Sequence, residues 1–412
     1  MKCIINDDVV LSRPLEGPLT AQIRAFATWA RDQGYARCSR YRRVLLAACF
    51  SRWLGQQAVR LCRVSSDHPA RYLRSRARRV QVCRGDAAAL RQFMDFLHRQ
   101  GVIPAEKIAP RRLTPVDHEV QAFETYLRDD RALARATVVN YLPFARGFLT
   151  GRFGNGRLTL SRLCAGDVVR FVQRQAPRLH LKRAKLLTAA LRSFLHYARY
   201  RGAIALDLAA AVPPVANWSM TSIPRAIPAD AVRQLLASIS RRSAMGRRDY
   251  AIVLLLVRLG LRSSEVAFLE LDDIDWEAGQ ISVRGKGGQR TALPLPADVG
   301  EALAAYLRRG RPHSTSRRVF LRARAPIRGF LTQCAIGSIV RHALTRADIK
   351  APTTGAHQFR HALATQMLRH GASLTEIGEV LRHRSPETTT IYAKVDLTAL
   401  RTLAVPWPGG VR

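Results

Sequence analysis

Apolar residues recur every three to four positions along most of the chain, and this is the period of amphipathic helices. In the C-terminal half the pattern predicts helices at 229–239, 249–259, 297–307 and 332–347. Alternation with a period of two appears at 280–283 and 290–295, on either side of a glycine-rich turn, and predicts a short hairpin. The pattern therefore predicts a mainly α fold with a small antiparallel β element.

The N-terminal half contains a repeated pattern. Each copy has two similar segments in the same order and at nearly the same spacing, and the second segment of each copy ends in a glycine and an isoleucine. These segments are 26–32 and 89–103 in the first copy, and 123–129 and 190–204 in the second. The agreement favours a tandem duplication of a helical bundle over a chance resemblance between Arg-rich helices.

Prolines mark the boundaries between the parts of the chain. One proline-bounded stretch lies at 104–115, and four prolines interrupt any helix at 211–228. We therefore predict an N-terminal helical module at 1–110 that duplicates the next domain, a helical domain at 111–212, a linker at 213–228 and a C-terminal domain at 229–412.

Charge indicates the kind of partner. The chain has 412 residues, and its 67 Lys and Arg oppose 30 Asp and Glu, for a formal net charge of +37. Such an excess predicts a polyanionic partner, with nucleic acid favoured over a membrane surface. Basic runs such as 71–79 fit two interpretations, a solvated helix face or a face that contacts phosphates.

The seven cysteines are odd in number and scattered, without the paired spacing of a metal site. This usage is typical of reduced residues in a cytosolic protein. The longest apolar run, 251–257, is too short to cross a bilayer. We therefore expect a soluble cytoplasmic protein without membrane contact.

Several polar residues near the C-terminus have no role in a core. His357 and Arg360 lie three residues apart, hence on one helix face, where a rigid fork of donors and an imidazole suit an anion such as phosphate. His383 follows at the end of the next predicted helix. A further helix is predicted to begin at Ser385 and to carry Tyr392, so that both side chains reach one cleft.

Two further cations precede this group. Arg262 lies just before a predicted helix that Ser263 or Ser264 caps, with Glu265 in its first turn. Lys286 occupies the tip of the predicted hairpin, where lysine is common in ordinary turns as well as in sites that need a mobile donor.

Two patterns resemble metal sites, and we favour other interpretations for both. Asp272 and Asp273 are adjacent in sequence and precede a turn, which indicates a surface turn that enters a strand. His357 and His361 have the spacing of zinc ligands, but Arg360 lies between them and no carboxylate ligand is near. We predict no metal and no other cofactor.

The ordered motifs of the C-terminal domain, over roughly 222–396, resemble the tyrosine recombinase or phage integrase family. The matching segments are 260–265, 285–287, 357–361, 381–383 and Tyr392. The resemblance implies that Arg262 and Arg360 clamp a phosphate, that Lys286 is the hairpin lysine, that His357 and His383 are the two histidines, and that Tyr392 is the nucleophile.

The resemblance also implies a DNA clamp and a strand-transfer reaction. A phenol is a weak nucleophile at neutral pH, so it needs a base or a strongly cationic site around it to attack a phosphodiester. The expected product is a 3′-phosphotyrosyl link that a 5′-hydroxyl reverses, in the integration or transposition of a mobile element. A homotetramer on paired double-stranded DNA sites, with or without sister recombinases, is the expected assembly.

The sequence departs from the family pattern at two positions. Phe359 replaces a leucine, and Arg382 replaces a glycine whose backbone conformation an arginine resists. Two alternatives to a recombinase are therefore retained. A type IB topoisomerase would use the same residues to nick and reseal one duplex, and an accessory protein would bind DNA without cutting it.

Overall fold

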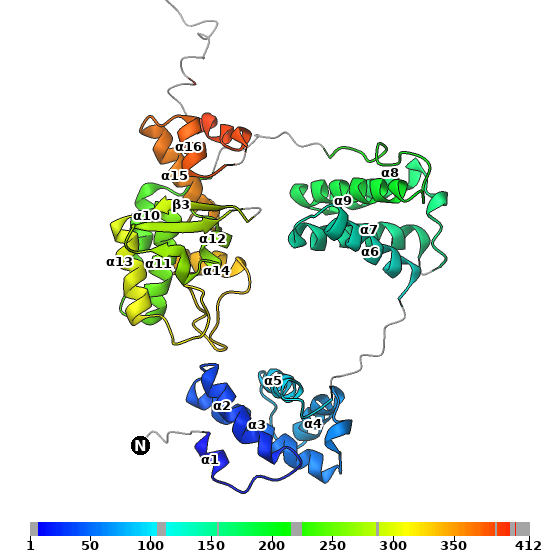
Figure 1. Ribbon diagram of the computed structural model, residues 1–412, viewed down its shortest axis with the longest axis vertical. Helices are drawn as coiled ribbons and strands as arrows, with labels where there is room; N and C mark the ends of the chain where they lie inside the picture. The colour runs from blue at the N-terminus through cyan, green and yellow to red at the C-terminus, as the bar shows by residue number, and fades with distance from the viewer. Residues whose placement is uncertain are drawn as a thin grey trace, which may run out of the picture. The chain divides into compact units, whose positions relative to one another are not determined.

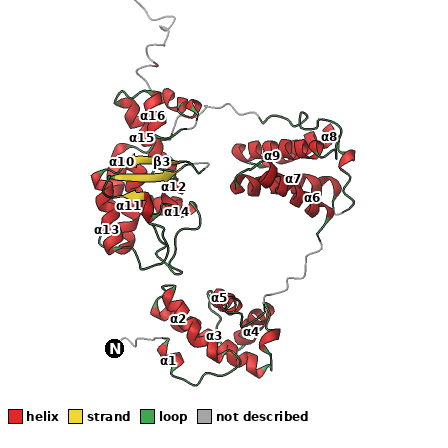
Figure 2. Ribbon diagram, in the orientation of Figure 1, coloured by secondary structure: helices red, strands yellow, loops and turns green. Residues whose placement is uncertain are grey.

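The computed structural model describes residues 7–104, 113–154, 156–215, 225–285, 288–383, 385–395 and 400. Contacts between Cα atoms divide the chain into two units, one formed by 1–106 and 222–412 and the other by 107–221. Most described residues are helical, and the described strands form one three-stranded sheet (Figures 1 and 2). The predicted mainly α fold with a small antiparallel sheet is confirmed.

The N-terminal module is a helical bundle around three aromatic residues. Phe26, Phe50 and Phe93 are 0% exposed, and each comes from a different helix. The elements are α1 (Asp8–Leu11), α2 (Thr20–Asp32), α3 (Arg37–Gln56), the 3₁₀ turn η1 (Leu61–Arg63), α4 (Asp67–Ala77) and α5 (Asp86–Arg99).

The second unit is also a helical bundle with aromatic residues at its centre. Phe123, Phe148 and Phe194 are 0% exposed. Its elements are α6 (Pro115–Thr125), the π-helical turn η2 (Tyr126–Asp130), α7 (Arg135–Phe153), η3 (Leu160–Arg162), α8 (Ala165–Gln175), η4 (Ala176–Arg178) and α9 (Leu181–Tyr200).

The C-terminal part is organised around α11 (Ala244–Arg258). Its residues 251–256 are at most 2% exposed, because neighbouring helices cover the helix on all sides. The surrounding helices are α10 (Ala229–Ser238), α12 (Ser263–Ala267), α13 (Ala297–Arg309), α14 (Cys334–Arg346) and α15 (His357–Arg369), and α16 (Leu374–Val380) packs on α15.

The sheet has the order β1 (Ile274–Asp275), β2 (Gln280–Arg284) and β3 (Arg290–Pro294), and both pairings are antiparallel. Arg284 pairs with Arg290, which leaves residues 285–289 as the hairpin tip. The period of two has a clear cause, since Ile281 and Val283 are buried while their neighbours are not. The predicted hairpin is confirmed.

The predicted helices are present to within a few residues at their ends, with one exception. In place of a helix that begins at Ser385 there are two 3₁₀ turns, η6 (Pro386–Thr388) and η7 (Thr390–Val395), and Ser385 makes no side-chain cap. The chain turns at Thr389, which is buried and whose hydroxyl bonds to a histidine rather than to the backbone of a helix.

Separate hydrophobic cores lie within 10–103, 116–212 and 227–359, and a small cluster surrounds Tyr392. The domain boundaries themselves stay predictions. Among the described residues, none of the helices combines the length and apolar character needed to span a membrane.

Candidate active site

Gly260 follows α11 and turns the chain toward the site. Its φ is +56°, and a Cβ there would lie 2.9 Å from Leu363 Cδ2 and 3.0 Å from Leu381 Cδ2. A side chain would therefore be strained by its backbone and would collide with its neighbours. Glycine at this position lets the loop pass close to α15 and to the end of α16.

Arg262, two residues later, is the N-cap residue of α12. The sequence predicted Ser263 or Ser264 at this cap, and that prediction is wrong. Glu265 Oε2 accepts the backbone N–H of Arg262 at 2.8 Å, which fixes the first turn of the helix one residue earlier.

Glu265 joins two arginines of the site. Its side chain is 1% exposed, and its oxygens lie 2.8 Å from Nη1 of Arg262 and 3.1 Å from Nη2 of Arg382. Arg262 Nη2 also donates to the backbone carbonyl of Arg382 at 3.2 Å. A buried carboxylate needs such partners, and here they connect two loops that are distant in sequence.

Arg360 is buried at the centre of the site. It is 1% exposed, and its guanidinium donates to the carbonyl of Gly260 at 2.8 Å and to that of Leu381. Burial, aided by the charges of Arg262 and Arg382, lowers the pKa of Arg360 to about 10, so it stays protonated at neutral pH. This side chain holds the loop of Arg262 against the loop of His383.

Arg382, where the resemblance implies glycine, has the backbone conformation that favours glycine. Its φ is +55°, the left-handed conformation that commonly ends a helix, and the N–H of His383 bonds to the carbonyl of Gly378 at 2.8 Å. The conformation costs a non-glycine residue about 1 to 2 kcal/mol. The pair with Glu265 and a 3.1 Å bond to the carbonyl of Val380 hold the arginine there.

Tyr392 lies in η7 and is 1% exposed. Its ring packs in a small apolar cluster with Ala364, Ile377 and Leu381, and its hydroxyl lies 3.0 Å from Nδ1 of His361. Burial raises the pKa of Tyr392 to about 12, partly opposed by the charge of Arg360. The phenol is therefore protonated at neutral pH.

His361 is the hydrogen-bond partner of that phenol. Burial, followed by the neighbouring His357 and Arg360, lowers the pKa of His361 to about 4. A neutral imidazole can accept the proton of Tyr392 at Nδ1, whereas a protonated one could not. His357 lies one helical turn earlier, with its ring centroid 4.4 Å from that of His361.

His383 lies on the other side of Tyr392, with the two rings stacked 6.4 Å apart. Its Nδ1 lies 2.7 Å from Oγ1 of Thr389, which fixes the orientation of the ring. Burial, then the charges of Arg360 and Arg262, lower the pKa of His383 to about 4. This histidine is therefore neutral at pH 7 in the structure.

A cleft of about 730 Å³ borders these groups. Arg262, Arg382 and His383 line one side, and Arg284 and Gln289 of the hairpin line another. A smaller hollow of about 430 Å³ lies between His357 and Arg262. Cations and neutral donors line both hollows, and the two carboxylates in the lining of the larger one, Glu265 and Asp273, are paired with arginines. This lining suits an anionic ligand.

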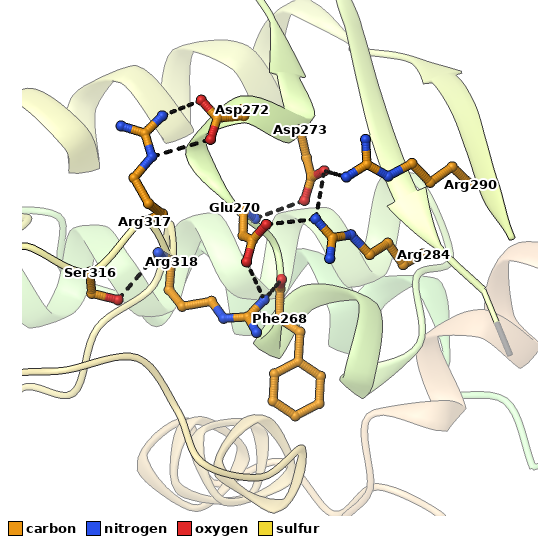
Figure 3. Close-up of polar contacts among 9 residues, drawn as sticks. All are labelled: Phe268, Glu270, Asp272, Asp273, Arg284, Arg290, Ser316, Arg317 and Arg318. Carbon is orange, nitrogen blue, oxygen red and sulfur yellow. Dashed lines mark hydrogen bonds and ion pairs between the residues drawn. The ribbon is translucent and has the colours of Figure 1, made fainter. Parts of the chain in front are cut away.

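The base of the hairpin is held by two carboxylates (Figure 3). Arg284, at the end of β2, lies 2.6 Å from Glu270 and 3.8 Å from Asp273, and Arg290, at the start of β3, lies 3.9 Å from Asp273. Both residues that flank the tip are thus bound to the turn before β1. Lys286, at that tip, lies outside the described residues.

The carboxylates of 270–273 therefore have arginine partners. Asp272 pairs with Arg317, and Glu270 pairs at 3.3 Å with Arg318, which also donates to the carbonyl of Phe268 (Figure 3). They form the 3₁₀ turn η5 (Leu271–Asp273), which leads directly into β1. A turn that enters a strand is the arrangement that the sequence favoured for this segment.

The structure brings four of the predicted site residues into one cluster, namely Arg262, Arg360, His383 and Tyr392, and places His357 beside it. Sequence analysis assigned no role in the site to Glu265 or His361. The spacing of Glu265 from Arg262 is that of a capping box, and His361 follows His357 by one helical turn. Either spacing could have indicated a contact in the site.

Comparison with known proteins shows the family to which the chain belongs. Residues 225–398 match the phage integrase family. A putative integrase/recombinase of Sinorhizobium fredii is 58% identical over 409 residues, which cover 99% of both chains. The tyrosine recombinase XerD of Mycobacterium tuberculosis is 31% identical over 309 residues, which cover 71% of this chain and 96% of XerD. The chain belongs to the tyrosine recombinase family.

Solved structures show the same fold as this tyrosine recombinase. The XerH site-specific recombinase, in a post-cleavage complex with a palindromic difH substrate, aligns with a TM-score of 0.56 at 21% identity. The alignment covers 71% of this chain and 87% of XerH. The sequence relatives support the recombinase over the topoisomerase and the accessory protein.

The conformation of Arg382 generates a first prediction. Glycine and alanine at this position both remove the pair with Glu265, but only alanine keeps the left-handed strain. The Arg382→Gly protein should therefore be more stable than Arg382→Ala by about 1 kcal/mol. Urea unfolding, followed by a signal from the C-terminal domain, measures the difference. Equal unfolding midpoints for the glycine and alanine variants would show that the backbone of residue 382 is not strained.

The lowered pKa values of His361 and His383 generate a second prediction. A histidine that is neutral in the folded state and charged in the unfolded state stabilises the fold above pH 6.5, and this contribution is lost as the pH falls toward 4. Stability should thus be constant above pH 6.5 and decrease below it. His361→Asn should make the decrease shallower in urea unfolding at pH 7, 5.5 and 4.5, and an unchanged decrease would exclude this cause.

Proposed function

We propose that this tyrosine recombinase cleaves and rejoins double-stranded DNA at specific sites, with Tyr392 as the nucleophile. The observation that carries the proposal is the arrangement around Arg360, which binds the loops of Arg262 and His383 to each other beside the tyrosine. The scissile phosphate would enter the cleft that Arg262 and His383 line.

Arg262 and His383 are suited to stabilise the charge that develops on the non-bridging oxygens. The Arg262 side chain is 33% exposed, so it can reach a phosphate while it keeps its contact with Glu265. Preorganised donors of this kind contribute about 3 to 4 kcal/mol each to transition-state stabilisation. Arg360 has both of its guanidinium contacts within the protein, so its contribution is to position the two loops and to add positive potential.

The nucleophile must lose its proton and reach the phosphate. His361 is the nearest acceptor for the phenol proton, with His357 beside it as the link to the hollow that Arg262 lines. Tyr392 is buried in its apolar cluster, and an attacking oxygen must contact phosphorus. Cleavage therefore requires the segment of Tyr392 to move toward the cleft when DNA is bound.

The reaction is a transfer between two oxygens. The Tyr392 oxygen forms a bond to phosphorus, the bond from phosphorus to the 5′-oxygen breaks, and the leaving oxygen takes a proton. Lys286 is the proposed donor of that proton, and the contacts of Glu270 and Asp273 orient the hairpin that carries it. The 3′-phosphotyrosyl bond conserves the energy of the broken bond, so a 5′-hydroxyl from another strand rejoins the DNA.

The proposed assembly is a homotetramer that clamps two DNA sites, with sister recombinases as further candidate partners. Exchange between two duplexes requires four strand cleavages, hence four tyrosines on paired sites. The proposed biological setting is the integration or transposition of a mobile element. The net charge of +37 supports the duplex partner.

A nicked suicide substrate tests the nucleophile. The wild-type protein should form an adduct with DNA that survives denaturation, Tyr392→Phe should form none, and Tyr200→Phe, at a residue that is 79% exposed, should behave as wild type. An adduct in the Tyr392→Phe protein would contradict the assignment. With intact substrates, recombinant products are expected, and relaxed plasmid without recombinants would indicate topoisomerase activity instead.

A further inference from the structure

The N-terminal module repeats the order of the main elements of the second unit, and only α1 in the first and η4 in the second have no counterpart among the described residues. In each, a helix of about four turns and a longer helix are followed by a three-residue 3₁₀ turn, an eleven-residue helix and a final long helix. The corresponding elements are α2, α3, η1, α4 and α5 in the first, and α6 with η2, α7, η3, α8 and α9 in the second.

The two cores make the same aromatic contacts. The centroids of Phe26 and Phe93 lie 4.8 Å apart, and those of Phe123 and Phe194, from the corresponding helices, lie 5.3 Å apart. The contact between α3 and α4 also has a counterpart between α7 and α8, and in both the two rings meet edge to face. Their centroid distances are 5.4 Å for Phe50 with Tyr72 and 5.2 Å for Phe148 with Phe171.

The final helices end in the same way. Gly101 has φ +66° and Gly202 has φ +70°, and the next N–H in each case bonds to a carbonyl five residues earlier, at 3.0 and 2.9 Å. Ile103 and Ile204 are then buried at 1% and 4% exposure. Agreement in element order, core contacts and helix ends supports the duplication that the sequence repeat predicted.

One helix of the first copy presents a row of free arginines. Tyr72 faces the core from α4, whereas Arg71, Arg74 and Arg78 are exposed at three- and four-residue spacing on the other face. Arg79 is exposed just beyond them. Within the described part of the chain, these four guanidiniums make no hydrogen bond or ion pair that would neutralise them.

In the second copy, the arginine that corresponds to Arg71 has a carboxylate partner. Aligned through Tyr72 and Phe171, Arg71 corresponds to Arg170, which pairs at 2.8 Å with Asp167 on α8. In α4 the position of Asp167 is taken by His68, whose Nδ1 accepts the backbone N–H of Ser65. The first copy thus has no carboxylate at the position of Asp167. Asp67 lies one helical turn before Arg71 on α4, but within the described residues the two side chains form no ion pair.

We propose that Arg71 and Arg74 of α4, with Arg78 and Arg79 directly after the helix, form a surface that binds the phosphate backbone of duplex DNA as a second DNA-binding surface. From the first to the third of these residues the helix rises about 10 Å, the span of about three phosphates along one strand. The arginines would contact phosphates and not base edges, so the surface would add affinity for DNA without specificity for its sequence. This surface goes beyond the catalytic reaction and does not depend on it.

Salt dependence of binding tests the surface in the full chain. The Tyr392→Phe protein provides the background, so binding is measured without cleavage and a failure of the proposed chemistry cannot affect the result. Replacement of the four arginines by glutamine should reduce the slope of log affinity against log salt by about 3 to 4, since each phosphate contact contributes about 0.9. Replacement of the same four by lysine keeps the charge and should leave the slope close to that of the parent.

Two results would overturn the proposal. One is a glutamine variant with the parent slope on duplexes of every length, at an unchanged unfolding midpoint. The other is a variant that keeps full DNA affinity but loses binding to vesicles of anionic phospholipid, which would assign the face to a membrane surface. With Tyr392 restored, the glutamine variant should still cleave a saturating suicide substrate at the wild-type rate, because no residue of α4 belongs to the candidate active site.

Discussion

The buried guanidinium of Arg360 is the interaction on which the candidate active site depends. It donates to the carbonyls of Gly260 and Leu381, which belong to loops more than a hundred residues apart in sequence. A buried charge is stable only when its donors are satisfied, so the two loops are held where those carbonyls can be reached. Arg262 follows the first carbonyl by two residues and His383 follows the second by two, so the position of both side chains is set by one cation.

Glu265 supplies the negative charge that this group of arginines needs. Arg262, Arg360 and Arg382 lie close enough for their charges to interact, and their mutual repulsion would be large without an anion among them. Glu265 contacts Arg262 and Arg382 and leaves Arg360 to the carbonyls. The candidate site therefore keeps an excess of positive charge, as the proposed phosphate ligand requires, while its own cations stay in place. Arg382, which departs from the family pattern, is part of this balance rather than a defect in it.

Local sequence patterns predicted most of the elements and named residues that the structure brings together in the candidate site, for physical reasons that individual residues show. Amphipathic period and hairpin alternation are local, so α10, α13, α14 and the β2–β3 hairpin could be predicted from neighbouring residues alone. The contacts of Glu265 with Arg382 and of His361 with Tyr392 join distant segments, and no local pattern encodes them. The helix expected after Ser385 is absent for a different reason, because the Thr389 hydroxyl bonds to the side chain of His383, six residues earlier, and two 3₁₀ turns replace the helix.

In the proposed reaction the oxygen of Tyr392 becomes joined to a DNA phosphate. Peptide mapping by mass spectrometry of a nuclease-trimmed covalent complex identifies the modified residue without any substitution. We expect a nucleotide 3′-phosphate on the peptide that contains Tyr392, and on no other peptide. A nucleotide attached to a different tyrosine, or to a serine or histidine of the same cluster, would show that Tyr392 is not the nucleophile.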